Sequence, residues 1–201
     1  MSKERIAITI DLDYWCGILK NPTLDLVYTI GCRVRHTSAP IYVVKHHDEA
    51  LNHLHYRHDL LINVDYHDDL VRESEVKRVH EGNWVTAVPW KAHAAYLWVM
   101  PWHGCKWKGE GLCDEDGQVW TKNSRLTGWN RIWKQLRGLH NIPWKDAKTI
   151  IVVLSPFWSE NHDIVRVKKM LRDFNDTRVI WSDAAKYTRG QRRKGWLGGT
   201  S

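Results

Sequence analysis

Carboxylates and imidazoles follow three apolar runs of the sequence, each at the point where the run ends. In "LLINVDYHDDL", residues 60–70, the apolar residues stop at three aspartates and a histidine. The runs in "IAITIDLD" and "IYVVKHH" end in the same way, in Asp-Leu-Asp and in Lys-His-His. Such side chains act as acids, bases or metal ligands. The residues concerned are Asp11, Asp13, His46, His47, Asp65, His67 and Asp69.

The spacing of these residues indicates a metal site. In an extended chain, residues i and i+2 point to the same side, so Asp11 pairs with Asp13 and Asp65 with His67, and Asp69 follows in the turn. With one imidazole from the His-His pair, the set suits Mn²⁺, Fe²⁺ or Zn²⁺, whereas Ca²⁺ and Mg²⁺ prefer oxygen ligands alone. Six ligands exceed the needs of one structural zinc and suit two bridged metals, which together can activate a water. Each segment alone also fits a solvated turn or a helix cap; the three together favour metal binding.

Five short apolar runs predict the strands that position these residues. Continuous runs of this kind are typical of strands buried on both faces, as in a parallel sheet covered by helices. In such a sheet ligands bind at the carboxyl ends of the strands, where the acidic residues and histidines fall. The runs cover residues 6–10, 41–44, 60–64, 95–100 and 149–154.

Three segments between the runs have helical features. "DEALNHLHYRH", 48–58, begins with acidic residues, and "SENHDIVRVKKMLRDF", 159–174, has apolar residues at helical spacing. "RLTGWNRIWKQLRGL", 125–139, is less regular. The alternation of strands and helices predicts an α/β fold, a three-layer sandwich with a mostly parallel sheet. We expect one catalytic domain over residues 1–185 and a basic, flexible C-terminal tail over 186–201.

Composition favours a soluble globular domain. The chain has 201 residues and a net charge of +7, a length that suits one domain with a sizeable core. No apolar run is long enough to span a bilayer, and the N-terminus lacks the apolar region of a secretory signal, so we expect a cytoplasmic protein. The four cysteines are then free thiols, with a Cys105–Cys113 disulfide as the alternative. The basic tail is either solvated or contacts nucleic acid or an acidic peptide.

Several segments resemble a known family. "VDYHDDL" and "ITIDLDYW" resemble the DxHxD and DxD signatures of the arginase/agmatinase (ureohydrolase) superfamily. With "YVVKHHDEAL", "EGNWVTAVPW" and "IVVLSPFW", the chain is most similar to a small arginase-like family. Some of its members are peptide arginases, which convert arginine side chains in ribosomally made precursor peptides to ornithine. The similar blocks run from about residue 6 to about residue 170, and the resemblance implies an arginase-like sandwich.

The resemblance implies a dinuclear site for two Mn²⁺ ions, with Fe²⁺ or Zn²⁺ as less favoured metals. Two carboxylates would bridge the ions, and an imidazole and a carboxylate would complete each one. His47 matches the family ligand better than His46 because it directly precedes the acidic pair that starts a helix. The implied arrangement has Asp11 and Asp65 as bridges, His47 and Asp69 on one ion, and His67 and Asp13 on the other, with Asp69 also orienting the bridging hydroxide.

The sequence departs from the superfamily pattern in three places. The DxD strand precedes the DxHxD strand, whereas the superfamily has the reverse order, so we expect a permuted arrangement. Val85 stands where arginases have a histidine after Gly-Asn, which leaves His80 as the candidate proton shuttle. The strand that ends in a guanidinium-binding glutamate in arginases ends here in Ser155, and Glu160 or Glu81 would have to replace that acid.

These departures favour a peptide over free arginine, because a peptidyl residue carries neither the α-carboxylate nor the α-amine. The chain has thirteen tryptophans, and core packing accounts for over half of them in our interpretation. Those near strand ends, Trp15, Trp84, Trp102 and Trp158, could line a groove that holds a peptide backbone and an arginine stem. Asn83 is a further candidate substrate contact.

The resemblance therefore implies a Mn²⁺-dependent peptide arginase. Metal-bound hydroxide would attack the guanidinium carbon of an arginine in a precursor peptide with a leader segment, giving peptidyl ornithine and urea. One alternative is a small-molecule amidinohydrolase of the arginine or agmatine type, or a related metal-dependent amide hydrolase. A non-enzymatic alternative is a nucleic-acid-binding module that uses the basic tail and exposed tryptophans.

Overall fold

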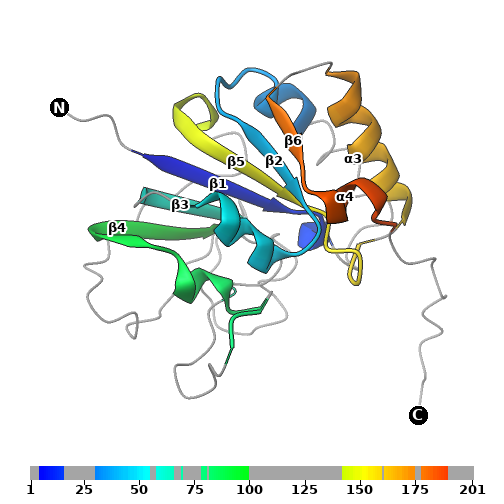
Figure 1. Ribbon diagram of the computed structural model, residues 1–201. Coiled ribbons are helices and arrows are strands. Elements are labelled where there is room, and N and C mark those ends of the chain that lie inside the picture. The colour runs from blue at the N-terminus through cyan, green and yellow to red at the C-terminus, as the bar shows by residue number, and fades with distance from the viewer. Residues whose placement is uncertain are drawn as a thin grey trace, which may run out of the picture.

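Six parallel strands form one sheet in the order β4-β3-β1-β5-β2-β6 (Figure 1). The computed structural model describes residues 5–15, 30–54, 58–65, 69, 78–80, 82–99, 142–159, 161–174 and 178–189. The strands are β1 (Ile6–Asp11), β2 (Ile41–Val44), β3 (His58–Val64), β4 (Trp90–Val99), β5 (Ala147–Val153) and β6 (Val179–Trp181). The helices and helical turns are η1 (Leu12–Trp15), η2 (Ile30–Val34), η3 (His47–His53), η5 (Trp84–Ala87), η7 (Trp144–Asp146), α3 (Asn161–Asp173) and α4 (Asp183–Tyr187).

The predicted α/β fold with a parallel sheet is confirmed. Each of the five predicted apolar runs overlaps a strand, although Leu154 follows β5 and Met100 lies outside the described residues, and α3 occupies the strongest predicted helix. The helix predicted over 48–58 is shorter, a 3₁₀ helix that ends at His53. The sequence did not predict β6 or α4, because β6 has only three residues, all of them partly or fully exposed. The helix predicted over 125–139 lies outside the described residues.

Two apolar layers cover the sheet, one on each face. Alternate residues of β1 face opposite layers: Ile8 and Ile10 pack with residues of α3, whereas Ala7 packs with residues of η3 and η5. Figure 1 shows α3 on one side of the strands and η3 and η5 on the other. The central strands are therefore buried on both faces, which explains why their sequences are continuously apolar.

Connections leave β1 and β3 in opposite directions. The described part of the β1–β2 connection, residues 30–40, packs on the α3 side, whereas the β2–β3 connection carries η3 on the other side. The chain moves along the sheet in one direction from β1 to β2 and in the other from β2 to β3, so two crossovers of the usual right hand use opposite faces. The connection from β3 to β4 leads away from β1, so the chain leaves the neighbours β1 and β3 in opposite directions. A crevice between the carboxyl ends of β1 and β3 is the usual ligand position in such a sheet.

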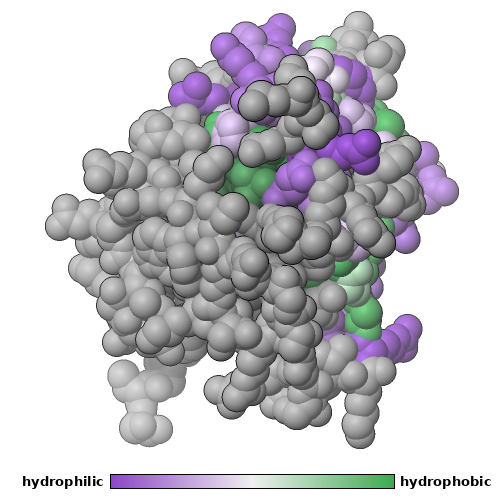
Figure 2. Space-filling model, turned by 90° about the vertical axis from the view of Figure 1, so that its left-hand side faces the viewer, coloured by the Kyte–Doolittle hydropathy of each residue, from purple (hydrophilic) through white to green (hydrophobic). Residues whose placement is uncertain are grey.

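Most of the described apolar surface is buried. Figure 2 views the molecule from the left of Figure 1; the described residues visible there are mostly hydrophilic, with apolar residues between them. The exposed large apolar side chains include Phe157 and Trp158, beside the carboxyl end of β5. Within the described ranges, no helix has both the length and the apolar character needed to cross a bilayer.

The predicted tail begins inside a helix that is anchored to the body of the protein. Lys168 of α3 is only 8% exposed, and its amine donates hydrogen bonds to the carbonyl oxygens of Ala185 at 2.8 Å and Lys186 at 2.7 Å. A third bond, of 3.3 Å, reaches the carbonyl of Thr188. One buried amine thus bonds three carbonyls at the C-terminal end of α4, where a helix leaves carbonyls without intrahelical partners; the carbonyl of Ala185 also accepts the N–H of Thr188. Of the tail, the structure describes only residues 186–189, so its flexibility stays a prediction.

We expect Lys168→Met to destabilise the protein by about 1–3 kcal/mol, because it keeps the aliphatic stem but removes the amine that bonds these carbonyls. The measurement is urea denaturation followed by circular dichroism. Lys169→Met is the matched control, since Lys169 is exposed on the same helix. Equal stability of the two variants would contradict a capping role for Lys168.

Candidate metal centre

Three buried ligand residues meet at the carboxyl edge of the sheet. Asp11 is the last residue of β1, Asp65 directly follows β3, and His47 begins η3 after β2. Because Ile10 pairs with Val64, the next residues, Asp11 and Asp65, lie on either side of the crevice between the two strands. The candidate ligand atoms of Asp11, His47 and Asp65 all lie within 4.8 Å of one another. These side chains form a buried group that can hold a metal ion.

The contacts of His47 fit a cation site. Its Nδ1 lies 3.1 Å from Asp11 Oδ2, 3.1 Å from Asp65 Oδ2 and 3.0 Å from Asp69 Oδ2. One N–H cannot donate well to three carboxylates, and a bare Nδ1 lone pair would repel all of them. Neighbouring donor atoms in an octahedral shell of radius ~2.1 Å lie about 3 Å apart. The observed separations therefore fit donor atoms arranged around a divalent metal ion.

Hydrogen bonds from β5 and from the chain after β1 hold Asp11 in place. Ser155 Oγ donates to Asp11 Oδ2 at 2.5 Å, and the backbone N–H of Asp13 donates to Asp11 Oδ1 at 2.9 Å. Ser155 has a positive φ of 39°, which is uncommon for a residue with a side chain and costs conformational energy. This strained position brings the end of β5 against the ligand of its neighbour β1.

A second set of donors holds Asp65 and Asp69. Asn63 Nδ2 donates to Asp65 Oδ2 at 3.3 Å, and Thr9 Oγ1 of β1 donates to Asn63 Oδ1 at 2.5 Å. The indole of Trp84 donates to Asp69 Oδ2 at 2.5 Å and stacks on His47, with ring centroids 4.7 Å apart. Partners of this kind orient metal ligands and are part of the working site.

Burial and charge change the protonation of the centre. Burial and the charge of Asp69 raise the pKa of Asp65 to about 8, although its contacts with His47 act in the opposite direction. Burial alone would lower the pKa of His47, but Asp69 and the hydrogen bonds to Asp11 and Asp65 raise it well above the usual value. Protons therefore occupy the metal-free centre near neutral pH, where a bound cation would displace them.

The structure places most of the predicted ligands together. Asp11, His47, Asp65 and Asp69 converge, and His47 rather than His46 enters the group, since His46 stacks on Phe157. His67 lies outside the described residues, so the second ion's imidazole stays a prediction.

Asp13 reaches the site in a different way from the one expected. The extended chain predicted through Asp13 is wrong, because β1 ends at Asp11 and η1 begins at Leu12. Asp13 is nevertheless only 3% exposed, and its backbone bonds to Asp11. Its place as a ligand of the second ion stays a prediction.

The predicted catalytic and substrate residues are more scattered. Asn83 is fully buried, and its amide joins the backbone of Arg78 and His80 within the turn that precedes η5. His80 is exposed and accepts a hydrogen bond from Gly82 N at Nδ1. In this arrangement Asn83 shapes the turn, and the shuttle role of His80 stays a prediction.

Two of the predicted substrate tryptophans have described side chains. Trp84 is fully buried, so it supports Asp69 and His47 from within instead of lining an open groove. Trp158 is 55% exposed and lies in the turn after β5. The side chain of Trp15, and all of Glu81, Trp102 and Glu160, lie outside the described part of the chain.

Ser155 and Thr9 are site residues that the sequence pattern does not identify. Each is a small hydroxyl residue at or in an apolar strand, a common occurrence without functional meaning. The feature that could have identified Ser155 from the sequence is its position at the end of a strand, the position that the acidic residues also occupy. Its contact with Asp11 follows from the adjacency of β5 and β1, which lie far apart in the sequence.

Comparison with known proteins identifies no relative: no family model matches this chain, and neither curated proteins nor solved structures give a match. The arginase-like resemblance therefore stands on the short segments of sequence alone.

We expect purified protein to bind a divalent metal, and Asp11→Asn and Asp65→Asn each to weaken that binding by more than about 100-fold, because each removes a charged ligand. Metal content after dialysis, measured by mass spectrometry of the ions, and titration calorimetry check this. Asp146→Asn, which changes an exposed aspartate outside the centre, should bind like the wild type. Metal affinity that persists in both site variants would exclude this centre as the binding site.

Metal affinity should rise with pH up to about 8. Asp65 has a raised pKa and must lose its proton to bind, and His47 must become neutral, so protons compete with metal at lower pH. Calorimetry with Mn²⁺ in buffers of different ionisation enthalpy should detect protons released on binding at pH 6.5. Affinity that is constant between pH 6 and 8, without proton release, would contradict this protonation of the centre.

Proposed function

We propose that this protein is a metal-dependent hydrolase of the guanidinium group of arginine residues in a peptide, and that it works with two Mn²⁺ ions. The observation that carries the proposal is the convergence of Asp11, His47, Asp65 and Asp69 at the crevice between β1 and β3. These are four of the six residues that the arginase-like segments assign to the metals. Asp13 and His67 would complete the second ion.

The donor set fits manganese well. Carboxylate oxygens dominate it and an imidazole completes it. This mixture suits Mn²⁺, whereas Mg²⁺ prefers oxygen ligands alone and structural zinc is often bound by thiolates. When bound, such a pair of ions lowers the pKa of a water and neutralises charge that develops on the substrate. This chemistry requires that the protein fix the ligands, which the bonds from Ser155, Asn63 and Trp84 accomplish.

Asp69 is our candidate for the residue that orients the attacking water. Its Oδ2 is held by the Trp84 indole and lies against His47, while its backbone has a positive φ of 50°. A carboxylate fixed in this way can accept the proton of a water and aim its oxygen at the guanidinium carbon. The oxygen adds to that carbon, the bond to the side-chain nitrogen breaks, and the ornithine amine leaves with a proton, giving urea.

Exposed aromatic residues beside the centre support a peptide substrate. Phe157 and Trp158 are 59% and 55% exposed, and they lie in the turn that begins with Ser155. Phe157 stacks on His46, directly before the ligand His47, with ring centroids 5.5 Å apart. Aromatic faces of this kind hold cationic side chains and their aliphatic stems. A peptidyl arginine brings no α-charges, so such a surface suits it.

Incubation of the Mn²⁺-loaded protein with arginine-containing peptides tests the proposal. We expect the mass loss that accompanies conversion of arginine to ornithine, together with urea in equal amount, measured by mass spectrometry and a urea assay. Asp11→Asn should lose the activity, and Asp146→Asn should keep it.

Substrate variation separates the alternatives. Turnover of free arginine or agmatine in preference to peptides would indicate a small-molecule amidinohydrolase. Absence of both urea and mass loss from peptides, from protein shown to contain two Mn²⁺, would reject the peptide-arginase proposal while leaving the metal centre intact.

A further inference from the structure

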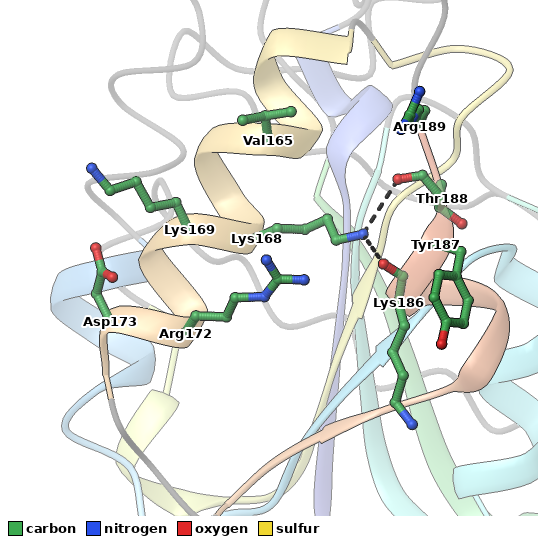
Figure 3. Close-up of a pocket in the computed structure, with 9 residues that line it drawn as sticks. All are labelled: Val165, Lys168, Lys169, Arg172, Asp173, Lys186, Tyr187, Thr188 and Arg189. Atoms are coloured by element: carbon green, nitrogen blue, oxygen red, sulfur yellow. Dashed lines mark hydrogen bonds between the residues drawn. The ribbon is translucent and has the colours of Figure 1, made fainter.

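A basic cavity lies between α3 and the end of α4, away from the metal ligands (Figure 3). Its volume is about 420 Å³, a size typical of ligand pockets. Cations dominate its lining, with a single carboxylate among the charged side chains: Lys168, Lys169, Arg172, Lys186, Arg189 and Asp173.

Internal contacts occupy two of these cations. The amine of Lys168 is bonded to the carbonyls of α4, as described above, and Lys186 forms a 2.8 Å ion pair with Asp183. These two side chains therefore build the wall of the cavity and contribute mainly to its potential. Burial and the neighbouring charge of Arg172 lower the pKa of Lys168, as expected where positive charges gather.

The side chains of the other three cations have no acidic partner among the described residues. Within the part of the chain that the structure describes, the side chains of Lys169, Arg172 and Arg189 form no hydrogen bond or ion pair. Arg172 lies over the ring of Trp181 at 5.5 Å, a contact that positions the guanidinium through its face and leaves its N–H edges open. Figure 3 shows the Arg172 guanidinium and the Lys168 amine in the space between the two helices. An oriented guanidinium without an acceptor is suited to bind a carboxylate or a phosphate.

The backbone around the cavity favours carboxylates spread along a chain over one compact phosphate. Residues 165–173 of α3 and the end of α4 line it, and both segments include a helix C-terminus, which presents carbonyl oxygens and a negative partial charge. Compact phosphates are usually held by backbone N–H groups at a helix N-terminus. In this cavity an anion must be bound by the long basic side chains at its edge, and these side chains can reach carboxylates that lie apart from one another. The exposed side chains of Tyr187 and Val165 add apolar contact area beside them.

We propose that this cavity binds an acidic peptide segment. Its carboxylates pair with Arg172, Lys169 and Arg189, and its aliphatic parts contact Tyr187 and Val165. This inference stands apart from the catalytic proposal, because it uses none of the metal ligands.

The helix α4 nevertheless connects the cavity to the element that carries His47. The side chain of Ser182, the N-cap of α4, bonds to Glu49 of η3 at 3.2 Å, while the other end of α4 lines the cavity. A helix of five residues is about 7.5 Å long. A peptide bound in the cavity would therefore lie about one short helix away from η3.

Binding of labelled peptides to the full-length protein tests the proposal. The probe is a fluorescent peptide of alternating Glu and Ser, and the reference is the same peptide with Gln in place of Glu, both followed by fluorescence anisotropy. We expect the acidic peptide to bind at least about tenfold more tightly and to weaken as salt is added, since exposed charge pairs are screened.

Matched variants locate the site. Arg172→Gln/Arg189→Gln should lower the affinity for the acidic peptide by about tenfold, as expected for loss of two exposed charge pairs. Lys145→Gln/Lys148→Gln removes the same charge from exposed positions outside the cavity and should leave affinity unchanged. Should the first variant unfold, Lys169→Gln/Arg189→Gln replaces it, since both residues are exposed.

Three results would overturn the proposal. The first is equal binding of the Glu and Gln peptides, and the second is an equal loss of affinity in the cavity and control variants. The third is tighter binding of a single-stranded oligothymidine or of inorganic phosphate that the cavity variant abolishes. It would assign the cavity to nucleic acid or to a compact anion.

Discussion

The contact of three buried carboxylates with one buried imidazole nitrogen is the interaction on which the rest of this structure depends. Asp11, Asp65 and Asp69 each lie about 3 Å from His47 Nδ1, and all four side chains are nearly fully buried. Buried charges of one sign are costly unless a cation or protons compensate them. The raised pKa of Asp65 and of His47 expresses this cost, and metal binding would remove it.

The parallel sheet makes this concentration of charge possible. Right-handed crossovers over opposite faces open the crevice between β1 and β3, and the registered ends of the two strands place Asp11 and Asp65 beside it. Polar residues inside the strands, Thr9 and Asn63, then hold Asp65 from behind. Burial of these groups is tolerable because each is hydrogen-bonded, and their bonds give the ligands one orientation.

The aromatic residues near the centre are of two kinds: one is buried and contacts the candidate ligands, and the others are exposed to solvent. Trp84 is buried beneath the ligands, where its indole fixes Asp69 and covers the His47 ring. Phe157 and Trp158 lie outside, on the turn that Ser155 begins. The same short turn thus joins a ligand-orienting hydroxyl to an exposed aromatic surface. A substrate held by that surface would lie next to the metal ligands.

The sequence by itself determined the parallel α/β sheet and the acidic residues that meet at its carboxyl edge, because buried strands have continuous apolar runs and the acidic residues directly follow them. The residue pattern left both His46 and His47 open, since both follow the same strand; the resemblance favoured His47, and in the structure η3 begins with His47. Only the tertiary structure decided the roles of Ser155 and Trp84 and the grouping of cations around the α3–α4 cavity. The physical reason is that spatial neighbours are set by strand order and helix packing: β5 lies beside β1 although about 140 residues of chain separate Asp11 from Ser155.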